Sequence, residues 1–444
     1  MNQLFQEIPW ADLPQTFQEA MWVTFRLDLR FIWIDSLCIC QDDTEDWRRE
    51  GSRMDTIYSD AYLALAASVS GSANQGLFVN SPLTTSRVLQ WQHRFQAYDF
   101  HARAHARHER LDARGMPILE RAWVFQERVL STRTVHFTTT ELLWECFEAS
   151  TCECSALPEF IPDSRRKDKQ VLEDGGLAKA TWHDFVQEYS TKQLTHEKDN
   201  FPALQGLMRR IYCSRDDEYY AGLWRNTIHQ DLLWCAVNYT RTGRPMQWRA
   251  PSWSWASVVG GVSWPVLRQQ EWYADTLIKW IDTVPIGGNE FGELGGGSLL
   301  LSGHCAQASL NHHTHVDAQG VSFSVFSLSL GDDHEREAKS LLCELDYNIT
   351  LPEHDSPRPT SPLISQKGSV SPGCNAACRH GNNSVPVASY ENVLVMRITP
   401  DIYLAFKYVR GSRRDFKRFA IAFADARDGD AQYFDANTRD VLVV

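Results

Sequence analysis

An uninterrupted apolar run near the start of the chain, Phe31-Ile32-Trp33-Ile34, constrains the fold more than any other segment. It follows a stretch, 12–27, whose apolar residues recur at near-helical spacing, and it ends abruptly at Asp35-Ser36. A run without polar alternation is typical of a strand covered on both faces, as in a parallel sheet. The sequence therefore predicts half of an α/β unit. Asp35 and Ser36 would lie at the carboxyl end of the strand, where open α/β sheets bind ligands, although Asp35 can equally cap a turn.

A second amphipathic helix is predicted after the polar turn at 41–44. Asp42 and Glu45 have the spacing of a helix cap and its capping box. Small or apolar residues then recur at steps of three and four: Trp47, Gly51, Met54, Tyr58, Ala61 and Leu65. We expect Trp47 to pack in the core.

The rest of the chain predicts further domains, because 444 residues exceed what one core usually organises. A helix at 120–128 and a hairpin at 133–146 would complete a first domain, 1–150. A mainly helical connecting region, 151–265, would end in a strand at 251–258 that alternates small and aromatic residues. The sequence pattern of residues 266–444 predicts a β-rich C-terminal region. Within it, a disordered loop is predicted at 352–389, because this segment is rich in Ser, Pro, Gly and Asn.

Composition narrows the class of protein. The formal charge of −12 argues against a nucleic-acid partner held by general phosphate attraction. Eleven Cys, an odd number spread thinly, fit a reducing compartment better than a disulfide framework. Neither a secretory signal nor an apolar stretch long enough for a membrane span is visible. We therefore expect a cytoplasmic protein.

Two ordered blocks of residues resemble the fungal heterokaryon incompatibility (HET) domain, and a third resembles a motif often found downstream of it in the same proteins. The first runs from Phe31 to Asp43 and continues through Trp47, Glu50, Met54, Tyr58 and Ala61; the second is Arg121 to Ser131, with Arg133, His136, Phe137 and Trp144-Glu145-Cys146; the third is Pro251 to Ser257. The likeness covers about residues 8–150 as a domain and is looser through 260. Family members usually carry a further strand, Tyr-x-x-Leu-Ser-Tyr-x-Trp-Gly, before the first helix, and this chain begins without it. We therefore expect a HET domain that is incomplete at its N-terminus.

HET domains are considered distantly similar to TIR domains, which are flavodoxin-like α/β modules that signal by assembly and in some cases cleave NAD. The resemblance implies an α/β, TIR/flavodoxin-like fold and makes NAD a candidate substrate. Cleavage would need a carboxylate beside the ribose. Glu50 follows Trp47 by three residues, whereas the TIR pattern has four, and Asp35 is the other candidate catalytic residue. Glu50 can instead be an exposed helix charge that pairs with Arg49 or Arg53.

The same resemblance implies a role in non-self recognition between fused fungal cells, with the domain triggering growth arrest or programmed cell death. We expect a protein partner. Whether the protein also forms homo-oligomers is undecided. The alternatives are a catalytically silent protein-interaction module and a TIR-like NAD hydrolase, so enzyme activity is undecided.

Candidate binding residues are Ser36, Trp47, Gln126, Glu127 and Arg128. Glu127 and Arg128 either form a buried pair that fixes the domain or contact a partner. No metal site is expected, because Cys38 and Cys40 would point to opposite faces of a strand. Cys146, Cys152 and Cys154 lack a fourth ligand at zinc-like spacing.

Overall fold

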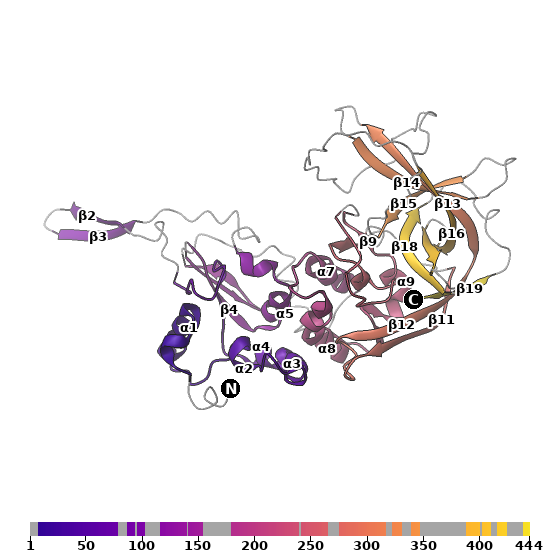
Figure 1. Cartoon of the computed structure of the whole chain (residues 1–444). Coiled ribbons are helices and arrows are strands. Elements are labelled where there is room, and N and C mark those ends of the chain that lie inside the picture. Colours follow the sequence, from indigo (N-terminus) through magenta and orange to yellow (C-terminus); the bar gives the residue numbers. More distant parts are fainter. Residues whose placement is uncertain are drawn as a thin grey trace, which may run out of the picture. The chain divides into compact units, whose positions relative to one another are not determined.

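The structure is a computed structural model, drawn in Figure 1. It describes residues 8–78, 87–93, 96–102, 116–139, 141–153, 179–238, 241–264, 275–316, 322–330, 339–346, 388–399, 402–409, 415–423 and 438–444. The chain divides into two compact units of mixed helices and strands. The first comprises Met1–Ile228, Pro245–Ala250 and Thr283–Gly296; the second comprises His229–Arg244, Pro251–Asp282 and Gly297–Val444.

Four helices form the N-terminal part of the first unit. After a 3₁₀ turn, η1 (Trp10–Asp12), helix α1 (Gln15–Arg26) confirms the first predicted helix, and α2 (Asp35–Cys38) is a single turn. The second predicted helix is broken into α3 (Thr44–Gly51) and α4 (Met54–Asp60). Gly and Ser propagate a helix poorly; α3 ends at Gly51, and the break consists of Ser52 and Arg53. Asp43 caps α3 instead of Asp42, because its carboxylate accepts the N–H groups of Glu45 and Asp46 at 2.9 and 3.1 Å.

The predicted buried strand at 31–34 is wrong. Residues 29–34 form no strand, and the Phe31 side chain is 85% exposed. Ile34 keeps an extended backbone, with φ −135° and ψ 120°, and α2 begins directly after it. A strand is held by hydrogen bonds to a neighbouring strand, and no described strand pairs with this segment.

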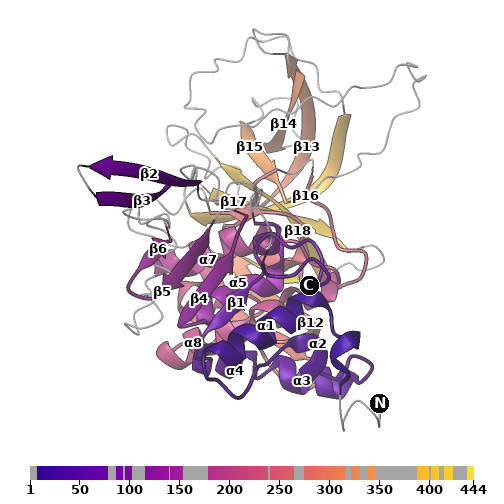
Figure 2. The ribbon, with the colours of Figure 1, turned by 90° about the vertical axis from the view of Figure 1, so that its left-hand side faces the viewer.

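The first unit contains a four-stranded sheet with the order β1-β4-β5-β6, whose strands are labelled in Figure 2. Its strands are β1 (Ala64–Ala66), β4 (Arg133–Phe137), β5 (Leu142–Cys146) and β6 (Ser150–Cys152). β1 is parallel to β4, and the other two pairs are antiparallel. Helix α5 (Ala122–Leu130) and the β4–β5 hairpin confirm the predicted helix and hairpin. A flavodoxin-like parallel sheet stays a prediction.

Aromatic side chains fill the core of the rest of the first unit. Trp182 on α7 (Lys179–Ser190) donates its indole N–H to the Gly222 carbonyl at 3.1 Å and meets Trp224 edge-on at 5.7 Å. The remaining elements are β2 (Arg87–His93), β3 (Gln96–Ala102), η3 (Pro117–Glu120), η4 (Glu197–Asn200), η5 (Pro202–Leu204), α8 (Gln205–Ser214), β7 (Tyr219–Tyr220), β8 (Leu223–Trp224) and η6 (Arg225–Thr227), followed by α9 (Ile228–Asp231).

The second unit is dominated by a nine-stranded sheet with the order β11-β12-β19-β18-β15-β14-β13-β16-β17. The strands are β11 (Leu277–Pro285), β12 (Leu294–Gly303), β13 (Cys305–Val316), β14 (Ser322–Leu330), β15 (Lys339–Leu345), β16 (Ala388–Thr399), β17 (Ile402–Tyr408), β18 (Asp415–Phe423) and β19 (Arg439–Val443), and β9 (Cys235–Ala236) pairs separately with β10 (Val262–Ser263). Because β17 also pairs with β18, six strands close into a ring. Inside this unit, Arg418 and Asp346 form a fully buried ion pair at 3.1 Å.

The predicted strand at 251–258 is also wrong. This segment consists of turns and a 3₁₀ helix, η7 (Trp255–Ser257), which Ser254 caps by accepting the Ala256 N–H at 3.1 Å. Every residue from 251 to 258 is buried, so the alternation does not mark one buried and one exposed face. The predicted loop at 352–389 lies outside the described residues except for 388–389, which belong to β16. The domain boundaries proposed from sequence stay predictions.

Candidate functional site

A polar pocket of about 620 Å³ lies within the first unit. Its walls come from α2 and the turn after it, α3, the first turns of α5 and the segment before η4. The lining residues are Asp35, Ile39, Gln41, Trp47, Gly51, Met54, Arg121, Trp123, Glu127, Gln193, Leu194, Thr195, His196 and Asp199. Charged groups and two tryptophans thus face one space.

Backbone contacts hold the far wall of this pocket against the start of α5. The Ala122 N–H donates to the Gln193 carbonyl at 2.9 Å, and the Gln193 side chain donates to the Glu120 carboxylate at 2.8 Å. These bonds fix the 193–196 segment beside Arg121, which precedes the first turn of α5. The pocket therefore joins side chains that are more than 150 positions apart in sequence, from Asp35 to Asp199.

Asp35 lies at the first position of α2 and is exposed on the pocket wall. Its Oδ1 accepts the Ser36 N–H at 2.7 Å. The sequence leaves two roles open for Asp35, capping a turn and facing a ligand site. In the structure its carboxylate accepts the N–H of the turn and also lines the pocket. Ser36 itself is exposed and is not among the lining residues of this pocket.

Glu127 is the most perturbed carboxyl group of the pocket. Burial raises its pKa from 4.5 to about 7, and the negative charge of Asp35 acts in the same direction. A hydrogen bond from the Tyr58 hydroxyl and the charge of Arg121 oppose this rise. Glu127 therefore changes its protonation state near neutral pH. A carboxyl that holds its proton at pH 7 can act as a general acid beside an ionised carboxylate.

Asp199 adds a second buried carboxyl group, with only 7% of the residue exposed. Its Oδ2 accepts the Trp123 indole N–H at 3.4 Å, while its Oδ1 has no hydrogen-bond partner among the described residues. Burial raises the pKa of this group, and the bond from Trp123 lowers it in part. An unpartnered oxygen in a pocket wall favours a ligand that carries N–H or O–H donors.

Trp47 and Trp123 meet edge-on in the pocket, with ring centroids 5.9 Å apart. Trp47 is partly buried, so it lines the pocket as well as packing against protein. The Lys198 ammonium lies 5.9 Å from the centre of the Trp47 ring. The two rings supply flat apolar walls beside the carboxyl groups.

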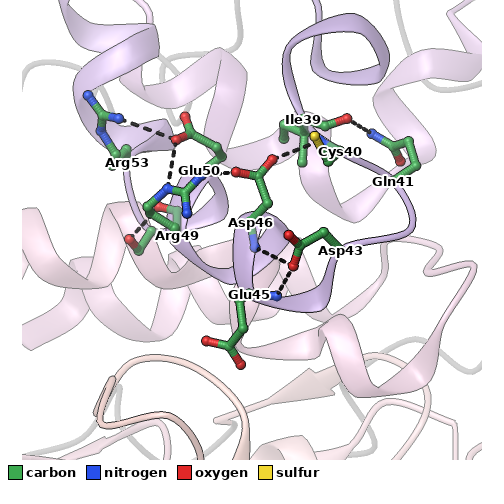
Figure 3. A network of polar contacts seen from close by, with 10 residues as sticks. Ile39, Cys40, Gln41, Asp43, Glu45, Asp46, Arg49, Glu50 and Arg53 are labelled. Carbon is green, nitrogen blue, oxygen red and sulfur yellow. Dashed lines mark hydrogen bonds and ion pairs between the residues drawn. The ribbon is translucent and has the colours of Figure 1, made fainter. Parts of the chain in front are cut away.

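Glu50, the other carboxylate proposed as catalytic, lies in an ion-pair network on α3 (Figure 3). Its Oε1 is 3.4 Å from Arg49 Nε and 3.3 Å from Arg53 Nη1. In the same network, Asp46 binds Arg49 and accepts the Cys40 N–H at 2.8 Å. Glu50 does not line the polar pocket, and this pairing is the one that its helix position predicts.

Gln126, Glu127 and Arg128 point to three different environments, although they are consecutive. Gln126 is fully buried, and its Oε1 accepts the Gly206 N–H at 2.9 Å, which fastens α5 to α8. Arg128 binds Glu145 on β5 at 2.7 Å. The proposed Glu127–Arg128 pair is therefore wrong, because helical geometry turns neighbouring side chains about 100° apart.

A buried network continues from Arg128 into the sheet. His136 Nε2 lies 3.1 Å from Glu145 Oε2, and His136 Nδ1 lies 2.9 Å from Ser68 Oγ. The three side chains come from different strands or their ends, and each residue is at most 2% exposed. A substrate cannot reach the Ser68 hydroxyl, so the Ser–His–Glu series ties β1, β4 and β5 together.

Within the described part of the chain, no cluster of three or more His, Cys, Asp or Glu side chains is arranged to hold a metal ion. None of the described helices has the length and apolar character that crossing a membrane requires.

With this geometry in place, comparison with protein families gives a match over residues 2–127 to the family described as Heterokaryon incompatibility protein (HET). The chain contains a HET domain. No match was found among the curated proteins or among the solved structures. The matched range includes Asp35, Arg121 and Glu127, whereas the 193–199 wall of the pocket lies beyond it.

Sequence reasoning missed part of this pocket. Arg121 and Trp123 belong to a block that resembles the family, but their spacing does not indicate that they line a pocket. Tyr58, whose hydroxyl bonds Glu127, shows in sequence only as a position on a helix face. His196 and Asp199 lie in a segment without a motif, and only the hydrogen bonds to the start of α5 bring that segment to the pocket.

Proposed function

We propose that this chain is a fungal heterokaryon incompatibility protein whose HET domain triggers growth arrest or programmed cell death after non-self recognition. The match of residues 2–127 to the HET family supports this function most directly. Association with a protein partner in the cytoplasm would carry the signal. The polar pocket supports a site within the domain, because Asp35 and Glu127 both belong to the matched range.

The experiment is inducible expression of the full chain in a filamentous fungus, with viability followed over time. The unaltered chain should arrest growth. Asp35→Asn and Glu127→Gln test the pocket, and Glu50→Gln is the matched control because it removes a carboxylate that does not line it. Normal growth of cells that contain the folded, unaltered chain would contradict the proposal.

A TIR-like NAD hydrolase is the second candidate. It is favoured by the raised pKa of Glu127, which is about 7, and by the Asp35 carboxyl group and two tryptophan walls in the same pocket. Measuring NAD in the same cultures, and with purified protein, separates the two mechanisms. Loss of NAD that stops in Glu127→Gln but continues in Glu50→Gln supports hydrolysis. A silent interaction module is supported if growth stops without loss of NAD and if all three variants still arrest growth.

A further inference from the structure

The polar pocket holds more carboxyl groups than basic groups. The carboxyl groups of Asp35, Glu127 and Asp199 line it, and the basic side chains among its lining residues are Arg121 and His196. Among the described residues, none of these three carboxyl groups forms an ion pair with a basic side chain. The pocket therefore has an excess of acidic groups that its own side chains do not pair.

Asp199 shows most directly what the pocket lacks. Only 7% of this residue is exposed, and its Oδ1 has no hydrogen-bond partner among the described residues. The other oxygen, Oδ2, is already bonded by the Trp123 indole. A buried carboxyl oxygen without a donor costs free energy, and a ligand that brings an N–H group to it recovers that cost on binding.

Glu127 and Asp35 indicate the charge of such a ligand. Burial raises the pKa of Glu127 to about 7, and the negative charge of Asp35 raises it in the same direction, although Arg121 opposes both effects. The charges of two neighbouring carboxyl groups thus disfavour each other. A cation beside them relieves this repulsion, so the pocket favours a positively charged ligand over a neutral or anionic one.

The two tryptophans select the kind of cation. Trp47 and Trp123 meet edge-on, with their ring planes 85° apart, and the faces of such rings attract cations. A planar guanidinium stacks on an aromatic face while its N–H groups point outward to carboxylates, which an ammonium group does less well. A metal ion is disfavoured, because no described cluster of three or more His, Cys, Asp or Glu side chains is arranged to hold one.

We propose that the polar pocket binds a guanidinium group, which belongs either to an arginine side chain of a partner polypeptide or to a small guanidinium compound. The group stacks on a tryptophan ring and donates its N–H groups to the carboxyl groups of Asp199 and Asp35. A volume of about 620 Å³ admits it together with an aliphatic stem. The proposal rests on the proposed function only in placing the functional site in this pocket.

Isothermal titration calorimetry on the purified full chain tests this proposal. Two probes carry the guanidinium: butylguanidine, which has no peptide backbone, and the peptide acetyl-Gly-Arg-Gly-amide. Their matched controls are butylurea and the same peptide with citrulline in place of arginine, because a urea group keeps the planar shape and removes the charge. The peptide acetyl-Gly-Lys-Gly-amide tests whether an ammonium group serves equally well.

The test variants are Asp199→Asn and Asp35→Asn. Asparagine at 199 still accepts the Trp123 N–H, and Asp35 is exposed, so its replacement disturbs no core packing. Asp42→Asn is the matched control, because it removes an exposed carboxylate from the same segment as Asp35 that does not line the pocket. Melting temperatures establish that all three variants fold, and Asp35→Asn carries the test if Asp199→Asn does not fold.

At least one guanidinium probe should bind, and its urea counterpart should bind at least about tenfold more weakly. Each test variant should weaken binding by about tenfold, which corresponds to the loss of one charge-assisted hydrogen bond, whereas Asp42→Asn should change it less than about twofold. Tighter binding of the arginine peptide assigns the group to a polypeptide partner, and tighter binding of butylguanidine assigns it to a small compound.

The proposal is overturned if neither guanidinium probe binds, if the urea controls bind equally well, or if the lysine peptide binds as tightly as the arginine peptide. It is also overturned if Asp42→Asn weakens binding as much as the test variants do. Binding to the purified chain is measured without reference to growth arrest. Failure of the proposed function in cells and failure of this binding are therefore separate results.

Discussion

Replacing Glu127 by Gln should stabilise the folded protein above pH 7 and leave its stability nearly unchanged at pH 4. In the unfolded chain this carboxyl ionises near pH 4.5, whereas in the folded protein burial and Asp35 hold its proton up to a pH of about 7. Between these two values the folded state binds more protons than the unfolded state, so stability falls as pH rises. Below pH 4.5 both states are protonated, and the effect vanishes.

The magnitude follows from the two pKa values. At about 1.4 kcal/mol for each pH unit, the interval from 4.5 to about 7 corresponds to about 3 kcal/mol of unfolding free energy at pH 8. Glutamine has the same shape, carries no charge and still accepts a hydrogen bond from Tyr58. Glu127→Gln should therefore recover most of that amount at pH 8 and about none of it at pH 4.

Urea unfolding followed by tryptophan fluorescence, at pH 4, 6 and 8, measures the difference between the variant and the unaltered chain. The control is Glu50→Gln, whose carboxylate lies between Arg49 and Arg53. That variant should not become more stable as pH rises. An equal effect of Glu127→Gln at pH 4 and pH 8 would refute the assignment of a raised pKa to this group.

The remaining predictions concern packing and caps, and urea unfolding checks each of them. Arg128→Met should lower the unfolding free energy by about 3 kcal/mol, because it removes the guanidinium that binds the buried Glu145 carboxylate; an effect under about 1 kcal/mol would contradict this. Gly206→Ala should lower it by about 2 kcal/mol, since an added Cβ would lie 2.9 Å from Asp55 Cβ and 3.0 Å from Gln126 Oε1, whereas Gly243→Ala meets nothing within 4 Å and should be nearly neutral. Asp43→Ala should lower it by about 1 kcal/mol through loss of the α3 cap, and an equal loss in Asp42→Ala would show that the cap is misassigned.

Local patterns predicted the elements whose contacts are close in sequence. The helix at α1, the helix at α5 and the β4–β5 hairpin follow from spacing within short segments, and the structure confirms them. The blocks that resemble the HET family lie partly in the same region, which is why the family was visible before any geometry. The ion pairing of Glu50 with Arg49 and Arg53 was likewise predictable from positions one and three residues apart on a helix.

The predicted strand at 31–34 failed for a reason that the sequence does not contain. Apolar, β-branched and aromatic residues describe a segment that can be a strand, but a strand exists only beside a partner with free hydrogen-bonding groups. The predicted strand at 251–258 is wrong for a related reason. All of its residues are buried, so the alternation of small and aromatic side chains does not separate an exposed face from a buried one.

The sequence by itself therefore determined the likeness of its N-terminal part to the HET domain, the main helices of that part and the presence of acidic residues at 35, 50 and 127. Tertiary structure alone decided which of them share a pocket: Asp35 and Glu127 face the 193–199 segment, while Glu50 is paired on α3. The physical reason is that a carboxyl group's pKa depends on burial and on charges within a few ångströms, and those neighbours come from distant parts of the chain.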